Sequence, residues 1–284
     1  MKPSAVMTVL ALAAFAPMAT QAQTSPERVA MVIGNESYTR LPLRNPVNDA
    51  RAVAAALKAV GFNVMLRENA GYSTMVEAMR EFLDRSGDAE VRLVYFAGHG
   101  AQFDGKNYLI PVDATLQHDK ELTTKAANAT ELAAKLAQHK SGVNIMILDA
   151  CREAPYPLVA TRNPLRSRAV APGLAGATAP QGTLIAFSTG PGGIALDGPA
   201  GANSAYTRHL VAHLAEPGLA IEQLFKRIRI GVSRDTQHKQ IPWETSSLMG
   251  DFCFRPARDG SCPLPAAAAS AGPSANHTYS ARVP

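Results

Sequence analysis

Short, uninterrupted apolar runs alternate along the chain with longer stretches in which apolar residues recur at helical spacing. The apolar runs predict strands at residues 28–34, 62–66, 91–96, 143–148, 183–188 and 248–254, with a short extended excursion at 107–112. The periodic stretches predict helices at residues 45–60, 74–85, 128–139, 203–214 and 221–234. Continuously apolar strands separated by helices are typical of a mostly parallel sheet covered on both faces. The pattern therefore predicts an α/β domain.

Capping and turn residues predict where several elements begin and end. Asn45 and Pro46 predict a helix start, with Asn45 as the N-cap and Pro46 in the first helical position. Thr74 and Glu77 have capping-box spacing and predict the start of the next helix. The Ala-Gly-His-Gly run at 97–100 predicts the end of the third strand.

The two ends of the chain lack this pattern. Lys2, a short apolar run at 5–16 and small residues at Thr20 and Ala22 predict a signal peptide cleaved after Ala22. An uncleaved membrane anchor is the alternative, and the short apolar run disfavours it. We therefore expect a protein that is exported, either periplasmic or secreted, with no stable membrane insertion. Its expected parts are a signal peptide at 1–22, a linker at 23–27, one folded domain at 28–256 and a disordered Pro- and Ala-rich tail at 257–284.

Composition supports one large globular domain. The 284 residues are 46% hydrophobic and 18% charged, which is a globular rather than a disordered composition. The formal net charge of +5 is spread along the chain, so we expect no nucleic-acid partner. The sequence does not predict an oligomeric state.

The chain has three cysteines, and export favours pairing between two of them. Cys253 and Cys262 lie close together near the C-terminus and predict a small disulfide loop. Cys151 is then left over. It is either a small buried hydrophobic residue or a catalytic nucleophile.

The chemistry should lie at the carboxyl ends of the strands, where sites form in open α/β sheets. His99 and Cys151 each follow a predicted strand and would face each other if those strands are neighbours. An imidazole beside a thiol is the pair that a cysteine nucleophile needs. Gly98 and Gly100 would let a substrate approach closely, and the N–H groups of Gly100 and Cys151 would form an oxyanion hole. The alternative is a structural turn beside an inert core cysteine.

These motifs resemble those of a known superfamily. Residues 95–100 read Tyr-Phe-Ala-Gly-His-Gly and residues 148–152 read Leu-Asp-Ala-Cys-Arg, which is similar to the catalytic motifs of the caspase–metacaspase superfamily, peptidase family C14. Four scaffold stretches support the resemblance, at residues 32–38, 43–49, 108–113 and 183–188. The resemblance, to bacterial metacaspase-like (orthocaspase-type) members, implies a caspase–haemoglobinase fold. That fold is a mostly parallel sheet of about six strands, the last antiparallel, with helices on both faces.

The departures from caspases indicate the specificity. Asp149 and Glu153 stand where caspases carry Gln and Gly, and the resemblance to metacaspases pairs Asp149 with Asp49 on the floor of a substrate pocket. Two carboxylates attract a cation, and the planar fork of Arg binds them well. Ala97 replaces a small hydroxyl residue that metacaspases carry there. The structural alternatives are a helix-dipole charge for Asp49 and a strand-end cap for Asp149.

Three functions compete. The leading hypothesis is a cysteine endopeptidase that acts on polypeptides and cuts after Arg in preference to Lys. Arg162, Arg166 and Arg168 are then candidate sites of self-cleavage. The alternative is that the loop containing them lines the pocket and stays intact. The second is a non-catalytic caspase-fold module that binds partners. The third, a small-molecule enzyme, lacks a glycine-rich nucleotide motif. We expect no cofactor or metal, since the pair His209 and His213 alone is weak evidence for zinc; calcium dependence cannot be inferred from the sequence.

Overall fold

The computed structural model describes residues 27–139, 141–151, 174, 176–191, 193 and 195–262. The expected signal peptide at 1–22 and the arginines at 162, 166 and 168 lie outside the described residues, as does the tail from 263 onward. Within the described part, no helix has both the length and the apolarity needed to cross a membrane.

The strands form one mixed sheet, whose main path runs β2-β1-β3-β6-β7-β8. These strands are β1 (Arg28–Gly34), β2 (Asn63–Glu68), β3 (Val91–Phe103), β6 (Val143–Cys151), β7 (Thr183–Phe187) and β8 (Trp243–Ser246). Every pair along the path is parallel except β7 with β8, which is antiparallel. Two short strands, β4 (Lys106–Leu109) and β5 (Ala127–Asn128), continue from β3. The predicted mostly parallel sheet of about six strands with an antiparallel last strand is confirmed.

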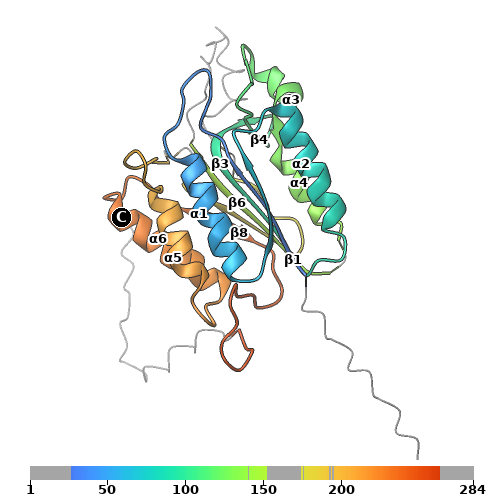
Figure 1. Cartoon of the computed structure of the whole chain (residues 1–284), viewed down its shortest axis with the longest axis vertical. Coiled ribbons are helices and arrows are strands. Elements are labelled where there is room, and N and C mark those ends of the chain that lie inside the picture. Colours follow the sequence, from blue (N-terminus) through green and yellow to red (C-terminus); the bar gives the residue numbers. More distant parts are fainter. Residues whose placement is uncertain are drawn as a thin grey trace, which may run out of the picture.

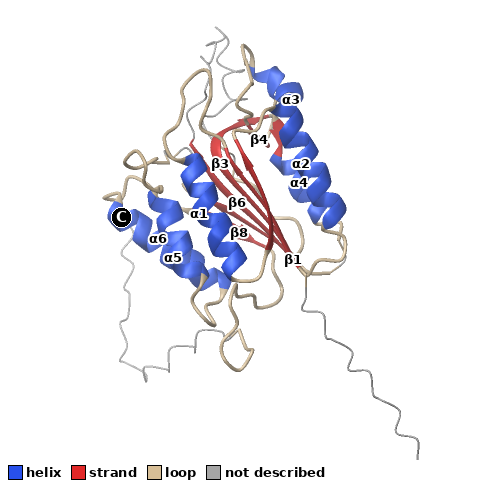
Figure 2. Ribbon diagram, viewed as in Figure 1, coloured by secondary structure: helices blue, strands red, loops and turns tan. Residues whose placement is uncertain are grey.

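Helices cover both faces of the sheet, as Figures 1 and 2 show. One face carries α1 (Pro46–Ala59), α5 (Ala205–Leu214) and α6 (Ile221–Asp235), and the other carries α2 (Tyr72–Arg85) and α4 (Ala129–Leu136). A short 3₁₀ turn, Asp119–Glu121, leads into α3 (Leu122–Lys125). Because successive strand residues face opposite sides, Tyr95 packs into the first core and its neighbour Phe96 into the second. Apolar strand residues on both faces therefore explain the uninterrupted runs in the sequence.

The last strand lies elsewhere than predicted. It is β8 at 243–246, and the predicted strand at 248–254 is wrong. The side chains of Phe252 and Phe254 were the source of the error, because they are apolar and buried against the helix-covered core rather than in the sheet. A single backbone bridge joins Cys253 to Ala220, next to α6. The strand that does pair with β7 is mostly polar, so its sequence carries no apolar run.

Local capping predictions were also partly wrong. Helix α2 begins at Tyr72, because Gly71 is its N-cap and Asp113 accepts the Tyr72 N–H from across the fold at 2.9 Å. Asn45 precedes α1 as predicted, but its side chain does not cap that helix. Strand β3 continues through the Ala-Gly-His-Gly run, since β6 pairs with residues 91–99 and β4 with residues 100–103.

The first residues of the expected disordered tail are ordered. Residues 257–262 form a turn, in which Ala257 donates its N–H to the Ser261 carbonyl at 2.9 Å. A disulfide joins Cys253 to Cys262, whose Cα atoms lie 5.7 Å apart.

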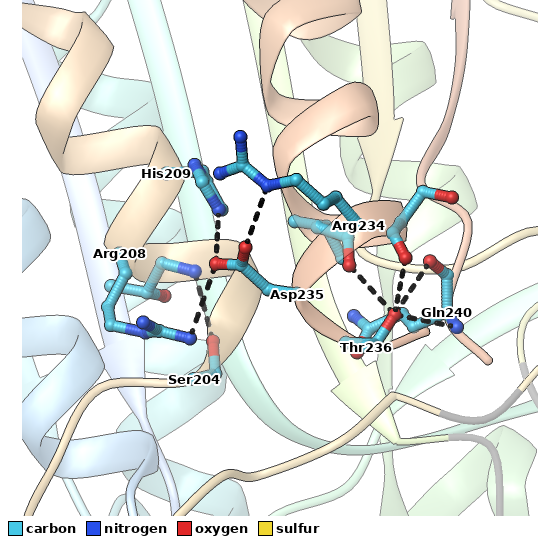
Figure 3. A network of polar contacts seen from close by, with 10 residues as sticks. Ser204, Arg208, His209, Arg234, Asp235, Thr236 and Gln240 are labelled. Atoms are coloured by element: carbon cyan, nitrogen blue, oxygen red, sulfur yellow. Dashed lines mark hydrogen bonds and ion pairs between the residues drawn. The ribbon is translucent and has the colours of Figure 1, made fainter. Parts of the chain in front are cut away.

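Two sets of polar contacts stabilise this side of the fold. One joins α5 to α6, and the other holds the loop that follows β7. Asp235 of α6 accepts from His209 of α5 at 2.9 Å and also pairs with Arg208 and Arg234 (Figure 3). Beyond α6, buried Gln240 donates to the Ser188 carbonyl at 2.8 Å and accepts the Leu196 N–H at 3.0 Å. The Gln240 amide thus spans both ends of the 188–196 loop and holds it against the sheet.

Candidate active site

The register of β3 and β6 brings the two predicted catalytic residues together. The strands run parallel, and the backbone pairs His99 with Cys151. The sequence predicts that His99 and Cys151 face each other on the condition that their strands are neighbours, and β3 and β6 are neighbours in the sheet. Cys151 is the last residue of β6, so the pair lies at the carboxyl end of the sheet, where α/β proteins build their sites.

His99 is buried and held by the loop that follows β1. Its Nε2 lies 2.7 Å from the Leu41 carbonyl, and its backbone N–H donates to the Tyr38 hydroxyl at 2.9 Å. The Tyr38 ring lies against the imidazole, with centroids 4.4 Å apart. A carbonyl can only accept, so Nε2 carries the proton and Nδ1 is the basic nitrogen. Leu41 has a positive φ of 53°, a left-handed conformation that is uncommon for leucine and often found at functional sites.

The two glycines beside His99 lie close against protein side chains. A Cβ on Gly98 would lie 2.6 Å from the Tyr38 hydroxyl, and the φ of Gly98 is +154°. A Cβ on Gly100 would lie 2.9 Å from a methyl carbon of Leu174. Close packing favours glycine at both positions, and the positive φ of Gly98 favours it further there.

The N–H of Gly100 points toward β6. The carbonyls of Ala97 and His99 accept from Asn35 and Ile110, which lie on the β1 side of β3. Backbone groups of successive strand residues alternate between the two sides. Gly100 therefore presents its N–H on the side where β6 and Cys151 lie.

The predicted pocket carboxylates also come together. Asp49 of α1 and Asp149 of β6 are both buried and line one small cavity. Its remaining walls are formed by Leu43, Pro46, Ala97, Gly98, Ala195, Leu196, Asp197 and Ser204. Because Gly98 lies one residue before His99 and Asp149 lies two residues before Cys151, the cavity adjoins this pair. Asp49 and Asp149 therefore share a pocket, which a helix-dipole charge or a strand-end cap alone would not require.

Burial makes the two carboxylates weak acids. Burial, and next the charge of Asp149, raise the pKa of Asp49 to about 8. Burial likewise raises the pKa of Asp149, against hydrogen bonds that lower it. A cation in the cavity would favour the ionised forms of both groups.

Sequence reasoning missed a third carboxylate, Asp197. Its Oδ2 accepts the Arg44 N–H at 2.9 Å, and the Asn45 side chain donates to the carbonyls of Asp197 and Pro199. The loop from β1 thus holds the loop that follows β7. A Leu-Asp-Gly turn is an ordinary surface pattern, so the sequence held no signal for this residue. Tyr38 and Leu41 also have no sequence signal for their roles. Tyr38 contacts His99 from the loop after β1 through its hydroxyl, and Leu41 does so through its backbone carbonyl.

Other predicted polar groups have structural partners. His209 contacts Asp235 and His213 contacts Glu216, so both histidines are engaged by carboxylates on the α5–α6 side. Among the described residues, no group of three or more His, Cys, Asp or Glu side chains is arranged to hold a metal ion.

The sheet order and the paired His99 and Cys151 define a protein of the caspase-like class. A family model described as the caspase domain, of peptidase family C14, matches residues 27–253. The chain belongs to this family of cysteine peptidases, some members of which are non-catalytic.

Comparisons with individual proteins agree with this assignment. The chain is 30% identical over 128 residues to mucosa-associated lymphoid tissue lymphoma translocation protein 1 of Homo sapiens and to its homolog of Mus musculus. The match covers 45% of this chain and 15% of each relative. The crystal structure of Caspase-1 from Spodoptera frugiperda superposes with a TM-score of 0.60 at 20% identity, covering 82% of this chain and 92% of the other. That likeness shows the fold.

Proposed function

We propose that this protein is a cysteine endopeptidase that uses Cys151 and His99 and cuts after Arg in preference to Lys. The observation that carries the proposal is the acidic cavity lined by Asp49, Asp149 and Asp197. It lies beside His99 and Cys151, which the register of β3 and β6 pairs. Cysteine peptidase chemistry follows from the family, and the basic specificity follows from the charge of this cavity. A cavity lined by carboxylates penalises an acidic substrate side chain and attracts a basic one.

The mechanism uses the tautomer of His99 that the Leu41 carbonyl favours. Nδ1 of His99 takes the thiol proton of Cys151, and the thiolate attacks the carbonyl carbon of the scissile peptide bond. The developing oxyanion is stabilised by the Gly100 and Cys151 N–H groups. The C–N bond then breaks, and His99 gives its proton to the leaving amine. Water, activated by His99, hydrolyses the thioester and returns the thiol.

A panel of fluorogenic peptides tests this function on the wild-type protein. The peptides carry Arg, Lys or Asp before the scissile bond and are otherwise identical. We expect turnover of the Arg peptide to exceed that of the Lys peptide and turnover of the Asp peptide to be negligible. A protein that cleaves none of them, over a range of calcium concentrations, would instead be the non-catalytic partner-binding module.

The pocket should make the stability of the free protein depend on pH. Asp49 has a pKa of about 8 in the fold against an ordinary value of 3.8, so the folded state holds a proton that the unfolded state releases. Its contribution to stability is therefore complete below about pH 4 and is lost as the pH rises toward 8. We measure the free energy of unfolding of Asp49→Asn and of the wild type in urea from pH 5 to 9. Across this range we expect the difference between them to shift in favour of the variant by more than about 1.4 kcal/mol, which corresponds to one pKa unit.

The exposed Glu77→Gln variant is the control for this measurement, because it removes a carboxylate from α2 on the opposite face of the sheet. Its stability should follow the wild type at every pH. Parallel curves for Asp49→Asn and the wild type would show that Asp49 is ionised in the fold and that its pKa is not raised.

A further inference from the structure

One buried serine contacts both pocket carboxylates. Ser204 precedes α5, donates its backbone N–H to Oδ1 of Asp49 at 2.9 Å and donates its hydroxyl to Oδ2 of Asp149 at 2.8 Å. Asp49 belongs to α1 and Asp149 to β6, so Ser204 is a direct link between carboxylates from two separate elements. It also lines the cavity between them.

Ser204 is itself locked in place. Its hydroxyl accepts the Thr207 N–H at 3.0 Å, and its carbonyl accepts the Arg208 N–H at 3.0 Å, the bond that Figure 3 draws from the first turn of α5. The Thr207 hydroxyl adds a second bond to Oδ2 of Asp149 at 3.2 Å and contacts the Tyr95 hydroxyl at 2.7 Å. A buried, connected network of this kind restricts the rotation of the carboxylates that it binds.

We propose that Ser204 is a positioning residue that orients both carboxylates and so sets the preference for a guanidinium over an ammonium group. The proposal rests on the proposed function, since it concerns the basic side chain of the substrate. Ser204 engages Oδ1 of Asp49 and Oδ2 of Asp149 and so restricts the directions in which the two carboxylates can turn.

The two basic side chains depend differently on this orientation. A guanidinium presents its N–H donors in a rigid planar fork, and pairing with two carboxylates requires both to be correctly turned. An ammonium group is a compact charge with rotatable donors, so it depends mainly on the charge of the pocket. Loss of orientation with retention of charge should therefore harm Arg substrates more than Lys substrates.

The Ser204→Ala variant tests the proposal through kinetics on matched Arg and Lys peptides. We expect kcat/KM for the Arg peptide to fall by about tenfold, which is the lower end for loss of a hydrogen bond to a charged group. The fall should lie mainly in KM, and kcat/KM for the Lys peptide should fall less, so that the ratio between them shrinks. Ser204→Thr, which keeps the hydroxyl, should restore the ratio.

A purely structural role makes a different prediction. Ser204 is also the N-cap of α5, so the matched control is Asn128→Ala, which removes the side-chain cap of α4 on the opposite face of the sheet. That control loses a cap and should keep the wild-type ratio of Arg to Lys turnover. An unchanged ratio in Ser204→Ala would overturn the proposal and leave Ser204 as a helix cap.

A binding measurement separates this proposal from the proposed function. Agmatine, which carries a guanidinium, should slow the alkylation of Cys151 by iodoacetamide in the wild type and should do so less effectively in Ser204→Ala. Absence of protection in the wild type would contradict the acidic pocket itself, whereas equal protection in both proteins would contradict only the role of Ser204. If Ser204→Ala does not fold, Thr207→Val removes a hydroxyl bond to Asp149 at similar volume and should shift the ratio in the same direction.

Discussion

Replacement of Cys151 by alanine is expected to abolish peptidase activity, with kcat falling by about 10⁴-fold or more, as for other nucleophile–base pairs. His99→Ala should cost a similar amount, because without Nδ1 no group in register with Cys151 takes the thiol proton. Since the two residues act as one unit, the double variant should be no less active than either single variant. Initial rates on the Arg peptide give all three values.

Matched measurements distinguish a chemical role from a structural one. Circular dichroism and thermal unfolding should show each variant folded, because neither substitution introduces strain. His238→Asn replaces an exposed histidine beyond α6 and should keep full activity. Undiminished turnover by Cys151→Ala would exclude the proposed nucleophile, and undiminished turnover by His99→Ala would exclude the proposed base.

The second large effect concerns the charge of the pocket. In Asp149→Asn, kcat/KM for the Arg peptide is expected to fall by about a hundredfold or more, since an unpaired buried charge costs about 3–5 kcal/mol and each tenfold corresponds to about 1.4 kcal/mol. Asparagine keeps an oxygen that accepts from Ser204 and Thr207, so shape and hydrogen bonding change little. The loss therefore reports the charge. Steady-state kinetics over the Arg, Lys and Asp peptides provide the comparison.

The control for this variant is Asp84→Asn, which neutralises an exposed carboxylate of α2. It should match the wild type on every peptide. The alkylation rate of Cys151 should stay near the wild-type value in both variants, because the dyad is intact. Efficient cleavage after Asp by the wild type, with none after Arg or Lys, would show that the pocket has been assigned the wrong charge preference.

The parts of the fold that the sequence predicted are those specified by local signals. Uninterrupted apolar runs identify the parallel strands, because a strand buried on both faces has apolar residues at every position. Strand β8 escaped this reasoning, since it lies at the edge of the sheet and its sequence, Trp-Glu-Thr-Ser, has no such run. The apolar Phe252 and Phe254 were taken for strand residues because burial against helices leaves the same local pattern as burial in a sheet.

The start of α2 and the length of β3 show the same limit. The N–H of Tyr72 is satisfied by Asp113, a residue far along the chain, so no capping residue next to the helix could reveal its start. Glycines at 98 and 100 usually mark a strand end, yet β4 and β6 extend the strand through them. The reason for these glycines is the packing of Tyr38 and Leu174, which only the tertiary structure supplies.

By itself the sequence predicted the parallel sheet and placed His99 and Cys151 at strand ends, where neighbouring strands bring side chains to one edge. The family, and the pairing of Asp49 with Asp149 in one pocket, were predicted from the resemblance of its motifs to those of the caspase–metacaspase superfamily. Only the tertiary structure decided how these groups are held. The Leu41 carbonyl, Asp197 and Ser204 reach the site through backbone atoms and loops from distant parts of the chain. A backbone carbonyl or a loop carboxylate has no sequence signature of its own, because its role depends on which distant residue packs against it.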